Sequence, residues 1–419
     1  MSLKQWIAGI VSISVMAFAL AGCGGSTSSP DEKATAETTA PTQQEQEKEP
    51  VHLVVWSYMT PNEVAVVDEV AQQWAKETGN TVEVIPDQTG FQEYATAAAS
   101  GQGPDILYGI PHDNLGSFWK AGLLAEVPDG VINPSDYEQV GINAVSFEGK
   151  MYAVPISMEA IGLFYNKAMV QTPPTTWDEF MAIAKDKGFA YKVKDLYFSY
   201  GFIGGMGGYV FKDTGKGLDP TDVGLASPGA IAGLQLIADM IHKDKLMPID
   251  IDYDPAKAQF LNGKTAMWLT GPWEVASVRE AGLDFGVAPM PTLPNGKPFT
   301  PFVGVYAGFV AADSDKQEAA WDLIKYLQQN APLKLFDTAN RIPVKKEFLN
   351  TDKVQGDEII RGFAASAANG VPMPNIPEMP AVWAPAASMF ELIVSGATTP
   401  EEAAQQTVEA INEAVAGMK

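Results

Sequence analysis

The chain has 419 residues and a formal net charge of −23, with 46% hydrophobic residues, 10% aromatic residues and a single cysteine. A surface this acidic repels nucleic acid and anionic lipid, so we exclude nucleic acid as a partner and favour a neutral ligand. One cysteine excludes both an intramolecular disulfide and a thiolate metal site.

The first 22 residues predict a secretory leader. Lys4 precedes an apolar stretch that ends in the small residues Ala21 and Gly22. The stretch is too short for a permanent spanning helix, which needs about 20 apolar residues. Leu20-Ala-Gly-Cys23 resembles the bacterial lipobox, and this resemblance implies cleavage before Cys23 and lipid on its sulfur.

Residues 23–50 follow as a segment of Ser, Thr, Gln, Glu, Ala and Pro with almost no large apolar side chain. Such a segment cannot bury enough surface to offset its conformational entropy, so it is predicted to be a disordered tether. The remaining body of about 370 residues is too long for one core, and two domains are expected.

The body begins with strands predicted at 52–56, 81–85 and 105–108, which alternate with helices at 61–78 and 91–100. The first helix carries apolar residues at helical spacing and ends before Gly79. This βαβαβ order predicts an α/β domain with a largely parallel sheet.

The later elements continue the α/β pattern. They are predicted as strands 151–157 and 161–165, helices 177–187, 229–243 and 314–329, and a C-terminal helix from Glu401. Ser314 and Gln317 predict a capping box at the start of helix 314–329. The body contains no clean Gly/Pro-rich linker that would mark a single domain boundary.

Enzyme motifs are largely absent. The three histidines form no pair with metal spacing, and the sequence has no complete phosphate loop, no G-x-G-x-x-G and no G-x-S-x-G. We therefore expect no cofactor, no metal and no kinase or dehydrogenase activity. A glycoside hydrolase stays open because its two carboxylates leave little trace in a sequence.

Aromatic residues stand beside acids in segments interrupted by Pro and Gly. Examples are Tyr197 within 195–200, Trp273 before Glu274, and Trp383 after Met379-Pro380. Sugars present apolar faces and polar rims, so flat aromatic side chains with nearby carboxylates suit a sugar site.

From Leu53 to Lys419 the chain resembles bacterial extracellular solute-binding proteins of the maltose/maltodextrin-binding type. The segments that carry the resemblance are 103–106, 121–126, 155–160, 165–167, 266–273, 301–305 and 373–379, among them Ala266-Met-Trp-Leu-Thr-Gly-Pro-Trp273 and Met373-Pro-Asn-Ile-Pro-Glu-Met379.

The resemblance implies two α/β lobes, each a mainly parallel sheet flanked by helices, with three crossings between them and a ligand cleft that closes by hinge bending. The implied boundaries are 51–158 and 306–358 for the N-terminal lobe, and 159–305 and 359–419 for the C-terminal lobe.

The resemblance also implies the residues that bind sugar. Two tryptophans and two tyrosines would stack on or contact sugar rings, two acids would bind sugar, a third acid would stand in the site two residues before a stacking tyrosine, and a methionine would lie near the far subsite. These residues are Trp273, Trp383, Tyr197, Tyr253, Asp113, Glu159, Asp195 and Met373.

The chain departs from the best-studied member of the family mainly in the first lobe. Ser57–Thr60 replaces a charged loop, Gly109–Pro111 replaces a tryptophan with one residue inserted, and Asn114 replaces an arginine. Ala387 replaces an arginine in the second lobe. The stacking residues are therefore kept, while the polar contacts of the first lobe are rebuilt.

The resemblance implies a lipid-anchored monomer on the outer face of a Gram-positive cell membrane, delivering maltose or maltodextrin to the permease subunits of an ABC importer. Within the binding-protein class, a galacto-oligosaccharide or a cyclodextrin remains an alternative ligand. A glycoside hydrolase using Asp113 and Glu159, or a surface adhesin, would be a different class of protein.

Overall fold

The computed structural model describes residues 49–86, 90–215 and 217–418, and the part from Glu49 onward forms one compact unit. The predicted leader, the lipidation site Cys23 and nearly all of the predicted tether lie outside the described residues. No helix in the described ranges is long and apolar enough to cross a membrane.

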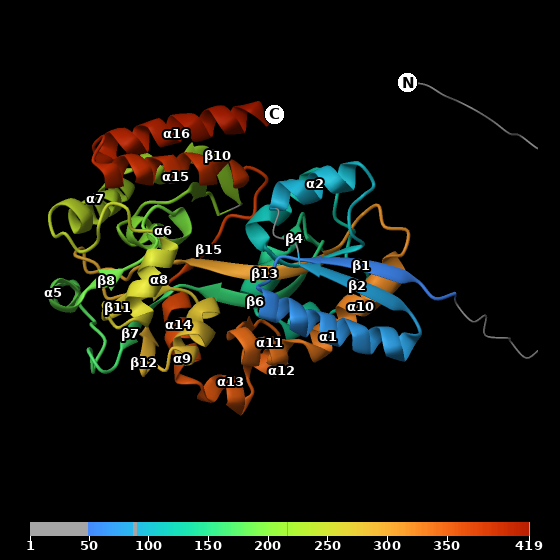
Figure 1. The fold of residues 1–419 in the computed structure, drawn as a ribbon. Helices are drawn as coiled ribbons and strands as arrows, with labels where there is room; N and C mark the ends of the chain where they lie inside the picture. The colour runs from blue at the N-terminus through green and yellow to red at the C-terminus, as the bar shows by residue number, and fades with distance from the viewer. Residues whose placement is uncertain (1–48, 87–89, 216, 419) are drawn as a thin grey trace, which may run out of the picture. The chain divides into compact units, whose positions relative to one another are not determined.

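The larger sheet has seven strands in the described part of the chain, in the order β14-β6-β13-β3-β1-β2 with β15 beside β13 (Figure 1). Its strands are β1 (His52–Ser57), β2 (Thr81–Pro86), β3 (Ile106–Pro111), β6 (Val154–Ala160), β13 (Phe302–Val310), β14 (Ile342–Pro343) and β15 (Val371–Pro372). β1 pairs in parallel with both β2 and β3, as the βαβαβ pattern predicts.

The strand β3 shows how this sheet separates two apolar clusters. Ile106 and Tyr108 pack into one cluster and Leu107 into the other, because successive side chains of a strand point to opposite faces. The register then shifts at Gly109, whose φ of 87° suits glycine, and Ile110 joins the cluster of Leu107. A Cβ at Gly109 would lie 2.3 Å from Met59 Cγ.

Helices cover both faces of the larger sheet. They are α1 (Pro61–Thr78), α2 (Phe91–Ala99), α3 (Leu115–Lys120), α4 (Gln139–Ala144), α10 (Gln317–Asn330) and α11 (Pro332–Ala339). The short helices α12 (Lys346–Leu349) and α13 (Asp352–Gly356) follow, and their Leu349 and Val354 pack against the apolar cluster around the smaller sheet. Val67, Val70 and Trp74 are buried along one face of α1. The Trp74 indole N–H donates to Asp322 Oδ2 at 2.8 Å and ties α1 to α10.

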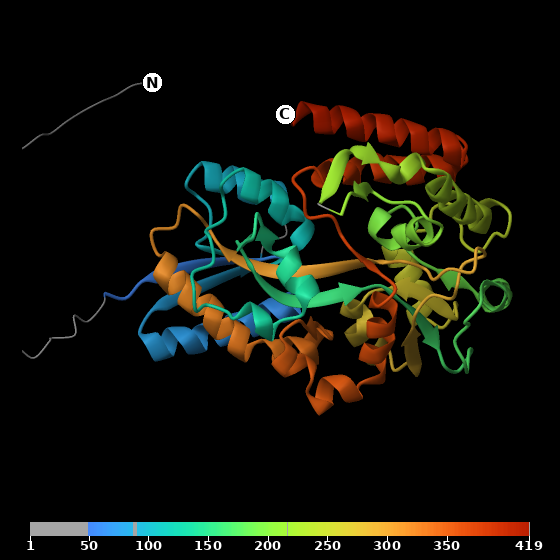
Figure 2. The same ribbon diagram turned by 180° about the vertical axis from the view of Figure 1, so that it is seen from behind.

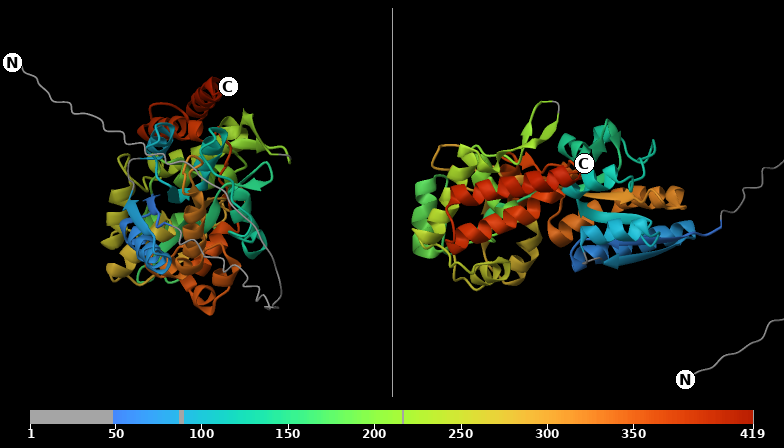
Figure 3. Two further views of the ribbon diagram at one scale, coloured as in Figure 1. Left: turned by 90° about the vertical axis from the view of Figure 1, so that its right-hand side faces the viewer. Right: turned by 90° about the horizontal axis from the view of Figure 1, so that it is seen from above.

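The smaller sheet has the strand order β12-β7-β11-β8. Its strands are β7 (Gly162–Asn166), β8 (Phe189–Ala190), β11 (Met267–Thr270) and β12 (Phe285–Ala288). The helices around it are α5 (Trp177–Lys187), α6 (Leu196–Gly205), α7 (Pro228–His242), α8 (Tyr253–Leu261), α9 (Val275–Glu280), α14 (Glu358–Ala367), α15 (Pro380–Ser395) and α16 (Pro400–Gly417). Figure 3 shows α15 and α16 side by side.

Two further strand pairs lie outside these sheets: β4 (Ser146–Phe147) with β5 (Lys150–Met151), and β9 (Phe211–Asp213) with β10 (Leu218–Val223).

The chain passes from the larger to the smaller sheet with one residue, Ile161, between β6 and β7. The long strands β6 and β13 run antiparallel beside each other up to this point (Figure 2). The architecture is therefore the expected two-lobed α/β fold. The lobe boundaries at 158/159, 305/306 and 358/359 stay a prediction.

Most of the predicted elements are confirmed, and the helices at 61–78 and 177–187 agree residue for residue. The expectation of mainly parallel sheets is wrong in detail, because both sheets are mixed. In the larger sheet β13 runs antiparallel to β3 and β6, and in the smaller sheet β7 runs antiparallel to β11 and β12. The crossing strands β6, β7 and β13 cause this mixture, and nothing in the local βαβ pattern reveals them.

The predicted capping box at Ser314 is also wrong. The helix α10 begins at Gln317, after Lys316. The Ser314 hydroxyl donates instead to Asp105 Oδ1 at 2.7 Å, and Lys316 Nζ lies 3.1 Å from Asp105 Oδ2. The serine hydroxyl that was expected to cap the helix therefore bonds to Asp105.

We predict that Gly201→Ala destabilises the fold by about 1–3 kcal/mol, because a Cβ there would overlap a buried ring. It would lie 2.0 Å from Phe299 Cζ. Chemical denaturation followed by circular dichroism measures the change. Gly356→Ala is the matched control, since a Cβ there meets nothing within 4 Å. Equal unfolding midpoints for the two variants would contradict the packing described here.

Candidate functional site

A cavity of about 490 Å³ lies where elements of the two sheets meet. Its lining combines rings, carboxyl groups and one guanidinium. The lining residues are Tyr58, Thr60, Pro111, Asp113, Asn114, Glu159, Asp195, Tyr197, Phe198, Trp273, Tyr306, Arg341, Met373 and Trp383.

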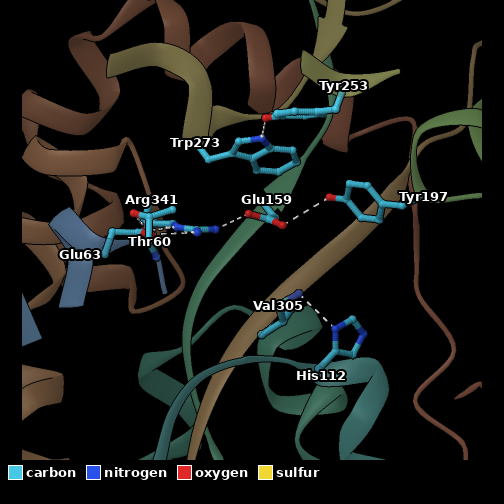
Figure 4. A network of polar contacts seen from close by, with 9 residues as sticks. All are labelled: Thr60, Glu63, His112, Glu159, Tyr197, Tyr253, Trp273, Val305 and Arg341. Atoms are coloured by element: carbon cyan, nitrogen blue, oxygen red, sulfur yellow. Dashed lines mark hydrogen bonds and ion pairs between the residues drawn. The ribbon is translucent and has the colours of Figure 1, made fainter. Parts of the chain in front are cut away.

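Seven of the eight residues predicted to bind sugar line this cavity. The eighth, Tyr253, lies behind Trp273, whose indole N–H donates to the Tyr253 hydroxyl at 2.7 Å (Figure 4). The Tyr253 hydroxyl in turn donates to the buried carboxylate of Glu274, which pairs with Lys257 at 2.8 Å. Tyr253 therefore fixes the orientation of Trp273 from behind. The roles of these residues in binding remain predictions.

Several of the rings that line the cavity come from elements around the smaller sheet. Trp273 follows β11 in a short 3₁₀ turn, η4 (Pro272–Glu274), and its ring centroid lies 6.2 Å from that of Tyr197, with 46° between the planes. Tyr197 stands in the first turn of α6, which Asp195 caps by accepting the Tyr197 backbone N–H at 2.8 Å. Trp273 and Tyr197 are half-buried, so each presents part of a ring to the cavity.

Asp113 and Trp383 meet in the lining of the cavity. Asp113 stands in a short 3₁₀ turn after β3, η1 (His112–Asn114), and Trp383 stands on α15. The indole N–H of Trp383 donates to Asp113 Oδ2 at 3.1 Å, and Asn114 Nδ2 donates to Oδ1 at 3.3 Å. Burial raises the pKa of Asp113 to about 7, and the hydrogen bond from Trp383 opposes this rise.

Glu159 lies near the end of β6 and is almost fully buried. One of its oxygens accepts from Arg341 Nη1, and the other accepts from the Tyr197 hydroxyl at 3.4 Å (Figure 4). Burial raises the pKa of Glu159 to about 7 although the Arg341 charge opposes the rise. The site therefore places one carboxyl group between a cation and a phenol.

His112 joins three segments beside the cavity. Its Nδ1 accepts the backbone N–H of Val305 at 3.1 Å, which requires Nε2 to carry the proton and donate to the Met373 carbonyl at 3.1 Å. Burial lowers the pKa of His112 to about 4, so the ring is neutral and keeps this tautomer. His112 thereby holds η1, β13 and the segment at Met373 together.

Sequence reasoning did not select seven of the lining residues: Tyr58, Thr60, Pro111, Asn114, Phe198, Tyr306 and Arg341. The sequence could have indicated two of these residues, because Asn114 adjoins Asp113 and Tyr306 lies at a predicted crossing between the lobes. It could not have indicated Arg341, because its partners Glu63 and Glu159 are 278 and 182 residues away in the sequence.

The described residues contain no group of three or more His, Cys, Asp or Glu side chains that could hold a metal ion.

Two mixed α/β lobes, joined where β6 passes into β7 after one residue, with an aromatic cavity where elements of the two sheets meet, define a class of receptor for a small ligand. The chain belongs to the family of bacterial extracellular solute-binding proteins, whose family model matches residues 60–333.

Individual relatives agree with this assignment. The maltooligosaccharide ABC transporter solute-binding lipoprotein of Streptococcus pneumoniae is 31% identical over 377 residues, covering 85% of this chain and 88% of the relative. The galactooligosaccharide-binding protein of Bacillus subtilis is 30% identical, with 85% and 88% covered. The crystal structure of the maltose-maltodextrin binding protein of Alicyclobacillus acidocaldarius matches with a TM-score of 0.83 and 42% identity, covering 86% of this chain and 99% of that protein.

The raised pKa of Asp113 gives a testable effect of pH on stability. An aspartate raised from 3.8 to about 7 on folding binds more protons in the folded state than in the unfolded state between these values. Its contribution to stability is fully present below pH 3.8 and is lost as the pH rises to 7. The free energy of unfolding of the wild type, minus that of Asp113→Asn, should therefore fall by about 1.4 kcal/mol per pH unit in this window.

Urea unfolding at several pH values from 4 to 8 measures this difference. A difference that is flat across the range, or that grows with pH, would show that Asp113 is ionised in the folded protein at pH 5.

Proposed function

We propose that this protein binds maltose or maltodextrin in the cavity and delivers it to an ABC importer. The observation that carries the proposal is the joint lining of the cavity by half-buried rings and buried carboxyl groups. Glucose units offer apolar C–H faces for the rings and hydroxyl protons for the carboxylates. No charged ligand is needed to satisfy these groups.

In this proposal Trp273 and Trp383 stack on sugar rings, and Tyr197 contributes a further ring. Asp113 and Glu159 accept sugar hydroxyls, Asp195 and Tyr253 fix the orientation of Tyr197 and Trp273, and Met373 contacts the far subsite. The lobes, bounded as the sequence implies, close around the sugar by bending near the β6–β7 and β13 crossings.

The ligand assignment is supported by relatives that are named for binding maltooligosaccharide and maltodextrin. The relative named for galactooligosaccharide has nearly the same identity, so a galacto-oligosaccharide is the main competing ligand, and a cyclodextrin is another. The stacking residues that the resemblance implies, Trp273 and Trp383, favour glucose rings, while the altered first-lobe loops would set the length of the oligosaccharide.

We further propose that the protein is a monomer held by lipid on Cys23 at the outer face of the membrane of a Gram-positive cell, where it meets the permease subunits. The streptococcal relative is named a lipoprotein, which supports this arrangement. A segment of about 27 polar residues would separate the lipid from the folded body.

Glycoside hydrolysis is the function that the carboxyl groups could otherwise serve, since Asp113 and Glu159 share one cavity. We propose that the chain is not an enzyme, because Glu159 is bound to Arg341 and Asp113 to Trp383, and the family consists of solute-binding proteins. Reducing ends released from maltodextrin during long incubation would overturn this view.

Calorimetric titration tests the proposed ligand. Maltotriose should bind one site with a dissociation constant near 1 μM, which corresponds to about −8 kcal/mol. A galacto-oligosaccharide titrated in parallel should bind more weakly. Absence of heat with maltotriose, together with no protection against thermal unfolding at millimolar sugar, would reject an α-glucan ligand.

Trp273→Ala should weaken maltotriose binding by about 1–3 kcal/mol, because it removes stacking area. Trp177→Ala is the matched control, since Trp177 is a half-buried tryptophan of the same lobe that packs on Phe180 and Phe202 away from the cavity. The control should lower the melting temperature and leave the affinity unchanged. Unchanged affinity in Trp273→Ala would mean that the sugar does not lie on this ring.

A further inference from the structure

A buried charge cluster lies at the first-lobe end of the cavity. Two of its members, Arg341 and Glu63, have no role in the binding scheme proposed above. The centre of the cluster is Arg341, which is 2% exposed and precedes β14. Its Nε and Nη2 donate to the two oxygens of Glu63 on α1, the latter at 3.2 Å, and its Nη1 donates to Glu159 on β6. Figure 4 shows Arg341 between the two carboxylates, and Glu159 between Arg341 and Tyr197.

The positions of all three charged groups are fixed by neighbours. Glu63 stands in the first turn of α1 and accepts from the backbone N–H and the hydroxyl of Thr60 at 2.9 and 2.6 Å. The guanidinium carbon of Arg341 lies 4.0 Å from the centroid of the Tyr306 ring. The cluster is therefore a built arrangement that draws on α1, β6, β13 and the segment before β14.

The charges in the cluster do not balance, because one guanidinium faces two buried carboxylates. Glu63 takes two of the three hydrogen bonds, and its pKa is lowered because the Arg341 charge and hydrogen bonds outweigh its burial. Glu159 receives one bond, and its pKa is raised by burial. The other titratable groups that face Glu159 are the hydroxyls of Tyr197 on α6 and Tyr306 on β13, and Asp113 lines the same cavity.

The protonation of Glu159 decides what it can offer a sugar. An ionised carboxylate only accepts hydrogen bonds and suits hydroxyl donors, whereas a protonated carboxyl group loses part of this capacity. A hydrogen bond to a charged acceptor is also about twice as strong as one between neutral groups. Whatever keeps Glu159 ionised therefore strengthens sugar binding.

We propose that Arg341 is a positioning residue of the sugar site, which holds Glu159 in place and ionised, and that Glu63 limits this effect by taking most of the guanidinium's hydrogen bonds. The inference rests on the proposed sugar-binding function. Arg341 also supplies a cation to the first lobe, where Asn114 and the loop 57–60 lack the charges of the best-studied family member.

The two partners of Glu159 should act in opposite directions. Removing the Arg341 charge makes ionised Glu159 less favourable, so the pH at which maltotriose affinity falls to half should rise by about one unit or more in Arg341→Gln. Removing the Glu63 charge leaves all of the Arg341 charge to Glu159, so the same midpoint should fall in Glu63→Gln. Glutamine at 63 can still accept from Thr60, so the start of α1 is kept.

The experiment is a maltotriose titration by calorimetry from pH 5 to 9 on the full mature chain and its variants. Arg341→Lys keeps the charge and should keep the midpoint near that of the wild type. Glu69→Gln is the matched control, because Glu69 lies on the same helix and pairs with Lys334 at 2.7 Å on the surface. Its midpoint should equal that of the wild type.

A Glu159→Gln background isolates the effect. In it, Arg341→Gln and Glu63→Gln should leave the pH profile unchanged, because Asp113 is then the remaining titrating acid proposed to bind sugar, and it contacts neither residue. The inference would be overturned if the midpoints of Arg341→Gln and Glu63→Gln shifted in the same direction or did not shift. It would also be overturned if the two substitutions shifted the midpoint equally with and without Glu159→Gln. If Arg341→Gln fails to fold, a midpoint in Glu63→Gln that does not fall overturns it alone.

Failure of the proposed function gives a different result. In that case the wild type would not bind maltotriose at any pH, whereas failure of this inference alone leaves wild-type binding intact without the opposite shifts.

Discussion

The backbone pairing of β6 with β13 is the constraint on which the rest of the structure depends. Both strands belong to the larger sheet, and β6 passes into β7 of the smaller sheet after one residue. Gly304 lies opposite Glu159 in this pairing, and a Cβ at Gly304 would come within 3.3 Å of Glu159 Cγ. The pairing thus places a carboxyl group at the junction of the lobes and leaves room for it.

The chemistry of the cavity follows from burial. Ionised groups are costly to remove from water, so each acid in the cavity has either a cation or a ring N–H beside it. Glu159 has Arg341 and Asp113 has Trp383. The acids that line the cavity are therefore held by hydrogen bonds beside the rings, an arrangement that suits a neutral ligand with hydroxyl groups.

The sequence predicted well what depends on local pattern and on family motifs. The helix at 61–78 follows from apolar spacing and a glycine stop, and Trp273 and Trp383 follow from motifs in the family's order. It could not predict what depends on contacts between distant segments. Ser314 bonds to Asp105 and does not cap a helix, and the antiparallel strands β13 and β7 make the larger and the smaller sheet mixed. Arg341 contacts Glu63 only because α1 and the segment before β14 pack together.

The single residue between β6 and β7 has a mechanical consequence. In a hinge motion the axis must pass close to Ile161, because the paired strands cannot stretch there. In the closure proposed above, Glu159 lies two residues before Ile161 and would travel little, whereas Asp113 and Trp383, which the predicted boundaries place on opposite lobes, would move relative to each other. In that closure the carboxyl group of Glu159 would keep its place, and the hydrogen bond between Trp383 and Asp113 would be the contact that forms as the lobes approach each other.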